Sequence, residues 1–256
     1  MSLVKFENRN GNLWVALNRR EALNAINRPL LEELLQGLEK SEGDGTIRSL
    51  ILLGEGGCFA SGADIRELSS LDAEGVRNFH ALREKTFARL EDFPSPTIAL
   101  IEKFALGTGL ELALCCDFRV ASSDAQLGVP SAKLGLVESY EYFARLLRAV
   151  GPSWAKRMVF TGEPVDAATA LRIGLVEEVC PGDQLFQQIE SILGRMEKNS
   201  AAAIRETKRV ISECRRDPNL DQVADSAAPM VSSTQTQDFR EATKAFLERK
   251  RRQERI

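Results

Sequence analysis

The sequence predicts an α/β protein, with a core built on a largely parallel, buried sheet over residues 1–195 and an all-helical region over residues 196–256. Short apolar runs alternate with amphipathic helix-forming segments through the core, which is typical of a parallel sheet built from strand–helix units. From Gln184 onward the alternation stops, and nearly every segment favours helix apart from a break at Asp217-Pro218. These observations set both the fold class and the division of the chain.

The strands of the core are predicted from short apolar runs that end at turn residues. The first two are expected to form a hairpin, because Asn10-Gly11 between them is a two-residue turn signal. The third is bounded by Gly54, as expected for a buried strand. In chain order, strands are expected at residues 3–7, 12–18, 49–53, 97–101, 118–121 and 175–179.

The helices are predicted from an apolar period near 3.6 residues and from their end signals. Asn27 is expected to cap the first helix, because Pro29 suits a first turn. Pro94 and Pro96 end the long central helix, and Gly151-Pro152 must divide a later one. Helices are expected after Asn27, after Gly62, and over residues 72–91, 107–116, 140–160 and 165–173.

Composition and charge exclude several classes of protein. The chain is 43% hydrophobic and 28% charged, as in ordinary globular proteins. No apolar run approaches the ~18 residues that a membrane span needs, so no membrane association is expected. The net charge is −3, but residues 240–256 carry +4 and the rest of the chain −7. A basic tail on an acidic body suits a phosphorylated small molecule, a nucleic acid or a solvated helix end.

The cysteines, the single histidine and the absence of several motifs exclude some kinds of catalytic and metal site. Five cysteines without a CxxC pair fit free thiols in a reducing, cytoplasmic environment, and the N-terminus shows no secretory signal. His80 lies in a polar helical stretch and is expected at the surface. Because it is the only histidine of the sequence, an HExxH zinc site, which needs two, is excluded. GxSxG, GxGxxG and GxxxxGK[ST] are absent, which argues against a serine hydrolase, a dinucleotide fold and a P-loop. We therefore expect neither a metal nor a separate cofactor.

Two loop-to-helix junctions carry the chemistry. The segments 58–65 and 105–111 each follow a predicted strand and open a predicted helix. The first turn of a helix presents unpaired backbone N–H groups at its positive dipole end. Two such ends that converge would bind a carbonyl oxygen on which negative charge develops. Taken singly, each junction is more typical of glycine used for packing.

Together with their flanks, these junctions resemble the enoyl-CoA hydratase/isomerase (crotonase) superfamily. The similarity runs in order along essentially the whole chain. The segments that carry it are Leu17 to Ala25, Phe59 to Ile65, Ala105 to Asp117, Thr161 to Val179, and Phe239 to Lys250.

The resemblance implies a fold, a chemistry and an assembly. The fold would be a crotonase-like spiral of ββα units with a C-terminal helical region used for trimerisation, giving a homotrimer or a hexamer built as a dimer of trimers. The chemistry would be stabilisation of an acyl-CoA thioester enolate, with enoyl-CoA hydratase in fatty-acid or related metabolism as the leading activity. Coenzyme A would belong to the substrate.

The resemblance also implies roles for particular residues. The backbone N–H groups of Ala63 and Thr108 would form the oxyanion hole, and Glu111 matches the first hydratase glutamate. The basic residues of the C-terminal tail would contact a phosphate of coenzyme A. Binding of nucleic acid by the tail is less expected, because the rest of the chain is acidic. The expected coenzyme A contacts are Leu23, Ala25, Ala60, Asp64, Ile65, Arg249 and Lys250.

The sequence departs from the family at three places. Thr108 stands where glycine is usual, and its backbone N–H survives that change. Ser131 occupies the position of the second hydratase glutamate, and serine is a poor general acid or base at neutral pH. Glu138 and Glu141 in the following loop are candidates for the missing carboxylate, or are solvated acids at a helix start.

These departures leave alternatives open. An enoyl-CoA isomerase or an acyl-CoA decarboxylase would use the same oxyanion hole with a single carboxylate. A catalytically impaired paralogue that binds acyl-CoA or RNA would need no carboxylate, and would predict salt-sensitive binding to nucleic acid.

Overall fold

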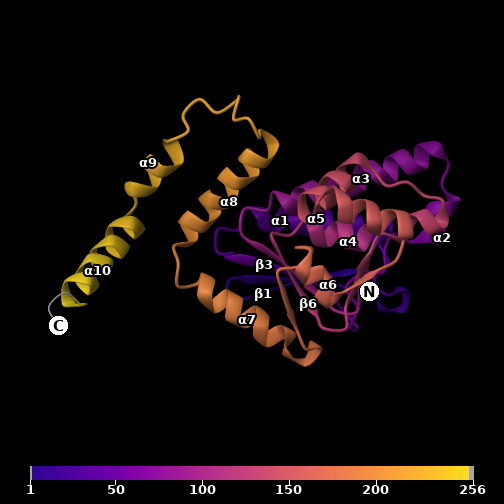
Figure 1. Ribbon diagram of the computed structural model, residues 1–256, viewed down its shortest axis with the longest axis horizontal. Helices are drawn as coiled ribbons and strands as arrows, with labels where there is room; N and C mark the ends of the chain where they lie inside the picture. Colours follow the sequence, from indigo (N-terminus) through magenta and orange to yellow (C-terminus); the bar gives the residue numbers. More distant parts are fainter. Residues whose placement is uncertain (1, 254–256) are drawn as a thin grey trace. The chain divides into compact units, whose positions relative to one another are not determined.

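The structure is a computed structural model that describes the backbone of residues 2–253 and the side chains of residues 2–248. The chain divides into two compact units, Met1–Gly194 and Arg195–Ile256. In Figure 1 the first unit runs from indigo to orange and the second from orange to yellow. The candidate site described below lies within the first unit.

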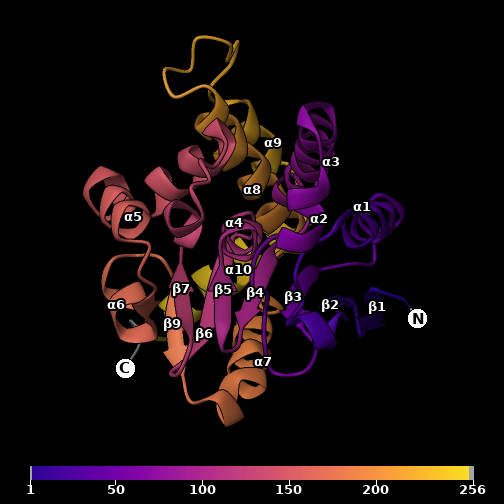
Figure 2. The same cartoon turned by 90° about the vertical axis from the view of Figure 1, so that its right-hand side faces the viewer.

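A six-stranded sheet forms the centre of the first unit, in the order β1-β2-β3-β4-β6-β9 (Figure 2). β1 and β2 pair antiparallel across the turn at Asn10-Gly11, and the other neighbouring pairs are parallel. All residues of β2 and β4 are buried, as expected for strands covered on both faces. The predicted α/β class is confirmed. The strands are β1 (Val4–Arg9), β2 (Asn12–Leu17), β3 (Ser49–Gly54), β4 (Thr97–Ile101), β6 (Phe118–Ser122) and β9 (Glu178–Cys180).

A second, three-stranded sheet supports the site. It has the order β5-β7-β8, with β5 (Phe104–Leu106) parallel to β7 (Gln126–Gly128) and β8 (Val165–Asp166) antiparallel to β7. The sequence analysis missed this sheet, because strands of two or three residues are too short for a period to be visible. Its carboxyl edge carries Gly107 on one strand and the chain leading to Ser131 on the next.

The helices of the first unit cover the sheets and carry the expected end signals. Asn27 and Asp72 accept hydrogen bonds from first-turn N–H groups as the N-caps of α1 and α3. α5 is interrupted at Gly151, where φ is 70° and ψ is 172°, as the Gly-Pro pair predicts. The bounds are α1 (Arg28–Glu42), α2 (Ile65–Ser70), α3 (Ala73–Glu91), α4 (Thr108–Leu114), α5 (Tyr140–Thr161), α6 (Ala167–Arg172) and α7 (Leu185–Met196), with 3-10 turns η1 (Arg20–Ala22), η2 (Pro130–Leu134) and η3 (Gly182–Gln184).

Two predicted elements of the first unit are present but begin later than the sequence analysis placed them. Residues 165–173 begin as strand β8 and become helical only at α6, because Asp166 is the N-cap of that helix. The strand predicted at 175–179 starts later, as β9. Leu175 and Val176 instead close the end of α6, where both N–H groups donate to the Ala170 carbonyl. Their apolar character reflects burial in the core and not a strand.

The second unit is helical throughout its regular elements, α8 (Ala201–Arg216), α9 (Ala228–Thr234) and α10 (Gln237–Gln253). α8 ends where the sequence predicts, since Asp217 is its C-cap. No residue of α8 is buried within this single chain. Among the described residues, no helix combines the length and the apolar character needed to cross a membrane. All five cysteines are free thiols.

Candidate active site

The two predicted loop-to-helix junctions lie against each other. Ala60 joins them, because its N–H donates to the Phe104 carbonyl at 2.9 Å and its carbonyl accepts from the Leu106 N–H at 3.1 Å. Gly109 makes the approach possible: a Cβ there would lie 2.5 Å from the Ala60 carbonyl oxygen. The expectation that the junctions converge is therefore met by direct backbone hydrogen bonds.

Ala63 and Thr108, the two residues expected to form the oxyanion hole, lie at a common cavity. Both residues line a cavity of about 250 Å³. Thr108 is the first residue of α4 and Ala63 directly precedes the N-cap of α2, so neither N–H has an intrahelical partner. Within the described chain, neither donates a hydrogen bond to another group. Two unsatisfied donors at one cavity can bind an oxygen atom that becomes negatively charged.

Tyr142 holds the second junction in place. Its hydroxyl donates to the Gly107 carbonyl at 3.0 Å, and the side chain is fully buried. Gly107 has φ of 47°, a left-handed conformation that favours glycine. This hydrogen bond ties the start of α4 to α5. Sequence reasoning missed Tyr142, although its spacing with Leu146 and Val150 marks the buried face of α5.

The wall of the cavity has an apolar part and a polar part. One part is apolar and includes Leu68, Val76 and Phe79. Another part is polar and brings together side chains from α3, η2 and the loop before α5, namely His80, Arg83, Ser131, Glu138 and Ser139. Ser131 is 4% exposed, and its hydroxyl has no hydrogen-bond partner among the residues that the structure describes. A small molecule in the cavity would therefore meet a hydroxyl, a guanidinium and a carboxyl group at this polar end.

Glu111 is buried behind this wall and does not line the cavity. Its Oε1 accepts a hydrogen bond from Arg145 Nη1 at 2.9 Å, and its Oε2 lies 3.5 Å from Arg83 Nε. Complete burial raises the pKa of Glu111 to about 8, against the lowering effect of the two arginines. The expected hydratase glutamate is thus held between two guanidinium groups, with Arg83 between it and the cavity.

Glu138 is the carboxyl group that reaches the cavity. Its side chain is 6% exposed, and its Oε2 lies 3.8 Å from Arg83 Nη1. Burial raises the pKa of Glu138, while the Arg83 charge opposes that rise. A carboxyl group with a raised pKa on the wall of a cavity is suited to proton transfer with a molecule bound there.

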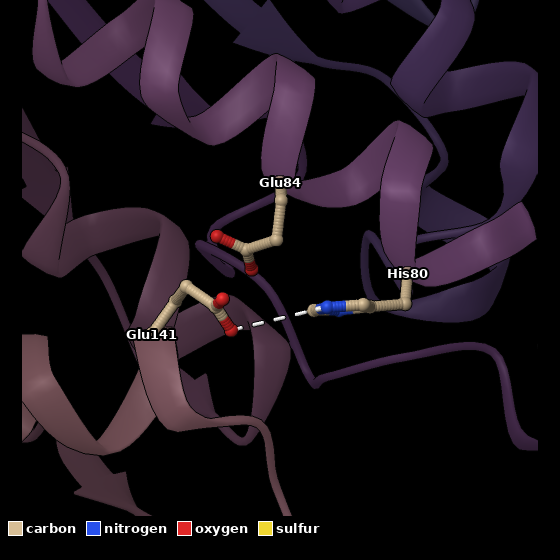
Figure 3. A group of neighbouring side chains, drawn as sticks. All are labelled: His80, Glu84 and Glu141. Atoms are coloured by element: carbon tan, nitrogen blue, oxygen red, sulfur yellow. Dashed lines mark ion pairs between the residues drawn. The ribbon is translucent and has the colours of Figure 1, made fainter. Parts of the chain in front are cut away.

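Glu141 lies outside the cavity, and with His80 and Glu84 it forms a separate cluster (Figure 3). The three ligand-type atoms lie within 4.8 Å of one another, and His80 Nε2 is 3.8 Å from a Glu141 oxygen. Arg83 hydrogen-bonds with His80 Nδ1 at 3.3 Å, and Arg145 donates to Glu84 at 2.9 Å. Two guanidinium groups already balance this cluster, which opposes a divalent cation. The side chain of His80 is 40% exposed, as expected for a surface residue, and His80 also lines the cavity.

The expected coenzyme A contacts fall into two groups. Residues 23–26 lie beside the first junction, because the Ser61 N–H donates to the Leu23 carbonyl at 3.0 Å and the Ile26 N–H to the Gly62 carbonyl at 2.8 Å. Leu23 and Ile65 are exposed and Ala25 is half-buried, whereas Ala60 is fully buried. The side chains of Arg249 and Lys250 lie outside the described residues.

Asp64 has a structural role that the sequence did not reveal. Its side chain caps α2 by accepting from the N–H groups of Arg66 and Glu67, and it pairs with Arg19 at 2.6 Å. Several hydrogen bonds and the Arg19 charge lower the pKa of Asp64, although burial opposes this. The carboxylate therefore fixes α2, and with it the Ala63 N–H beside the helix start.

Comparison with known proteins decides the family. The sequence profile of the enoyl-CoA hydratase/isomerase family matches residues 7–254. The chain belongs to the enoyl-CoA hydratase/isomerase family. Among curated members, crotonyl-CoA hydratase of Syntrophomonas wolfei is 36% identical over 92% of this chain and 91% of that protein. Short-chain-enoyl-CoA hydratase of Clostridium acetobutylicum is 35% identical over 93% of this chain and 91% of that protein.

Solved structures give the same result for this family member. Pseudomonas aeruginosa DspI superimposes with a TM-score of 0.89 at 32% identity, over 97% of this chain and 95% of that one. An enoyl-CoA hydratase of Mycobacterium smegmatis gives a TM-score of 0.91 at 26% identity, over 96% of both chains. The crotonase-like fold expected from the sequence is confirmed.

Proposed function

We propose that this chain is an acyl-CoA-processing enzyme that adds water to an enoyl-CoA thioester. The observation that carries the proposal is the pair of unbonded N–H groups of Ala63 and Thr108, in the same cavity as the Glu138 carboxyl. Membership of the family supports the thioester as the substrate class. The activity printed for relatives such as the crotonyl-CoA hydratase of S. wolfei supports hydration.

In the proposed mechanism, the two N–H groups hold the thioester carbonyl oxygen. Ionised Glu138 takes a proton from water as the water oxygen bonds to the β-carbon, and the electron pair of the double bond moves to form the enolate. Charge that develops on the thioester oxygen is stabilised by the N–H groups. Glu138 then returns the proton to the α-carbon, so that one carboxyl group completes the reaction. The Ser131 hydroxyl provides a hydrogen-bonding partner for the water.

A second candidate function is double-bond isomerisation. The observation that favours it is that Glu138 is the carboxyl group on the cavity wall, whereas Glu111 and Glu141 are not part of that wall. A 3-enoyl thioester would lose an α-proton to Glu138 and regain it at the γ-carbon. That reaction needs a single proton carrier and no water.

An assembly of several copies is part of the proposal. The second unit leaves large apolar side chains exposed in the single chain, including Ile211, Met230 and Phe246. Such side chains favour burial against other copies. We expect a homotrimer, or a hexamer made of two trimers.

Hydration of crotonyl-CoA by wild type and glutamate variants tests the function. Glu138→Gln keeps the shape of the side chain and removes the titrating group, so kcat should fall by about a hundredfold or more. Glu141→Gln should retain most of the activity, since that side chain lies outside the cavity. Equal losses in both variants, or a loss confined to Glu141→Gln, would contradict the assignment.

A further inference from the structure

Arg83 is the side chain that joins the two carboxyl groups of the site. It extends from α3 and is 7% exposed. Its Nε faces Glu111 Oε2 at 3.5 Å on the buried side, and its Nη1 faces Glu138 Oε2 at 3.8 Å on the cavity side. Nη2 is 3.1 Å from the Ser139 hydroxyl and 3.3 Å from His80 Nδ1. One rigid guanidinium therefore spans the wall between a buried carboxyl and a cavity carboxyl.

We propose that Arg83 is a positioning residue that holds Glu138 in the cavity and couples it to the buried Glu111. Glu111 then influences the reaction through Arg83 and not by touching the substrate. The inference rests on the proposed function of Glu138 as the proton carrier.

The contacts of Arg83 distinguish this role from a simple structural ion pair. Arg145 already donates to Glu111 at 2.9 Å and also pairs with Glu84 and Glu91, so the buried carboxyl has its own partner without Arg83. Arg83 Nε is buried and has no hydrogen-bond partner among the described residues; oxygens of Glu84 and Glu111 each lie 3.5 Å from it. A guanidinium that is incompletely bonded, with two of its nitrogens facing the cavity wall and Glu138, is placed to respond to the charge of either carboxyl.

The groups that surround Glu138 determine the expected pH behaviour. Arg83 faces it from α3, where His80 also lines the cavity, Glu111 acts on it from α4, and the Tyr142 hydroxyl group lies nearby on α5. Of these, Arg83 is the positive charge at ion-pair distance. Removing it would leave burial unopposed, so the carboxyl would ionise at a higher pH. A unit charge near 4 Å in a partly buried site shifts such a titration by about one pH unit or more.

The test measures the titration of Glu138 both with and without turnover. Protein labelled with carboxyl-13C glutamate is titrated by NMR, and the Glu138 signal is assigned by its loss in Glu138→Gln. In parallel, the pH profile of kcat is recorded with crotonyl-CoA. In Arg83→Met the Glu138 midpoint and the alkaline-rising limb of kcat should both move upward by about one pH unit. Arg83→Lys keeps the charge and should restore most of both.

A matched control comes from the same helix. Arg89 on α3 pairs with Glu42 at 2.8 Å and does not line the cavity. Arg89→Met removes the same charge from the same helix and should leave the Glu138 midpoint and the kcat limb in place. Circular dichroism and thermal melting of each variant show that it is folded. If Arg83→Met does not fold, Arg83→Gln provides the same comparison.

Glu111→Gln tests the coupling. Because burial raises the pKa of Glu111 to about 8, Glu111 gains its charge near that pH and then competes with Glu138 for the Arg83 guanidinium. The wild-type Glu138 signal should therefore show a second step near pH 8, which should vanish in Glu111→Gln and shrink in Arg83→Met. An unchanged Glu138 midpoint in Arg83→Met, or a second step of the same size with and without Arg83, would overturn the proposal. If wild type turns over no CoA thioester, the proposed function fails, while the NMR titration still decides the role of Arg83.

Discussion

Thr108 offers a direct way to remove one donor from the oxyanion site. It is the first residue of α4, a position at which proline is well tolerated, because the N–H of that residue has no intrahelical partner. Thr108→Pro therefore deletes the N–H without a helix-breaking clash. Thr108→Ala is the matched control, since it also removes the side-chain hydroxyl and methyl but keeps the N–H.

The magnitude follows from the burial and bonding of Thr108. The residue is 3% exposed, and the described chain provides no other acceptor for its N–H, so this donor acts in a water-poor site and is already in place before reaction. Removal of one such donor typically raises the barrier by about 3 kcal/mol, or between a hundredfold and a thousandfold in kcat. Thr108→Pro should show that loss, and Thr108→Ala should stay within about tenfold of wild type.

The assay is steady-state hydration of crotonyl-CoA, with binding of butyryl-CoA measured separately by calorimetry. Because the donor acts mainly on charge that develops during reaction, kcat should fall far more than the binding constant changes. A folded Thr108→Pro variant that keeps kcat within a few-fold of wild type would show that this N–H does not stabilise the transition state. So would a folded Thr108→Ala variant that loses as much activity as Thr108→Pro.

Three further predictions follow from individual contacts. Gly109→Ala should lower both the thermal stability and kcat, because the added Cβ would lie 2.5 Å from the Ala60 carbonyl oxygen. A variant whose melting temperature and hydration rate both match wild type would contradict this prediction. Burial raises the pKa of Glu111 to about 8, so the folded protein holds the proton of this carboxyl group more tightly than the unfolded chain does. The contribution of Glu111 to the free energy of unfolding should therefore fall as the pH rises from about 4.5 to about 8. Urea titrations across that range should show a weaker pH dependence for Glu111→Gln. Tyr142→Phe removes the hydrogen bond to Gly107 and should lower kcat with little change in butyryl-CoA affinity, whereas a pure loss of affinity would argue against a positioning role.

Much of the fold was predictable, because most elements carry their own local signals. The hairpin at Asn10-Gly11, the cap at Asn27 and the interruption at Gly151 all depend on neighbouring residues and appear where predicted. The small sheet was not predictable in the same way. β8 has two residues and exists because β7 lies beside it, a fact of tertiary structure that no local pattern contains.

The candidate site was predicted less completely than the fold. The two junctions were found from glycine-containing loops before helices, and the structure brings them together through Ala60. Glu111 and Glu138 were singled out from sequence position, but their burial and their separation by Arg83 depend on how α3 packs beside α4 and α5. Arg83 sits in an ordinary amphipathic helix, where a charged residue is more often solvent-exposed. Neither spacing nor composition distinguishes it from Arg89 on the same helix.

Isotope labelling shows whether enolate chemistry takes place at the N–H groups of Ala63 and Thr108. Wild-type protein is incubated in D2O with saturated, 2-enoyl, 3-enoyl, dienoyl and malonyl-type CoA thioesters, and the products are weighed by mass spectrometry. We predict that a 2-enoyl ester gains water and carries deuterium at its α-carbon. If no ester gains water or deuterium or loses CO2, while CoA thioesters still bind tightly, the account is contradicted and the chain is a binding protein built on an enzyme fold.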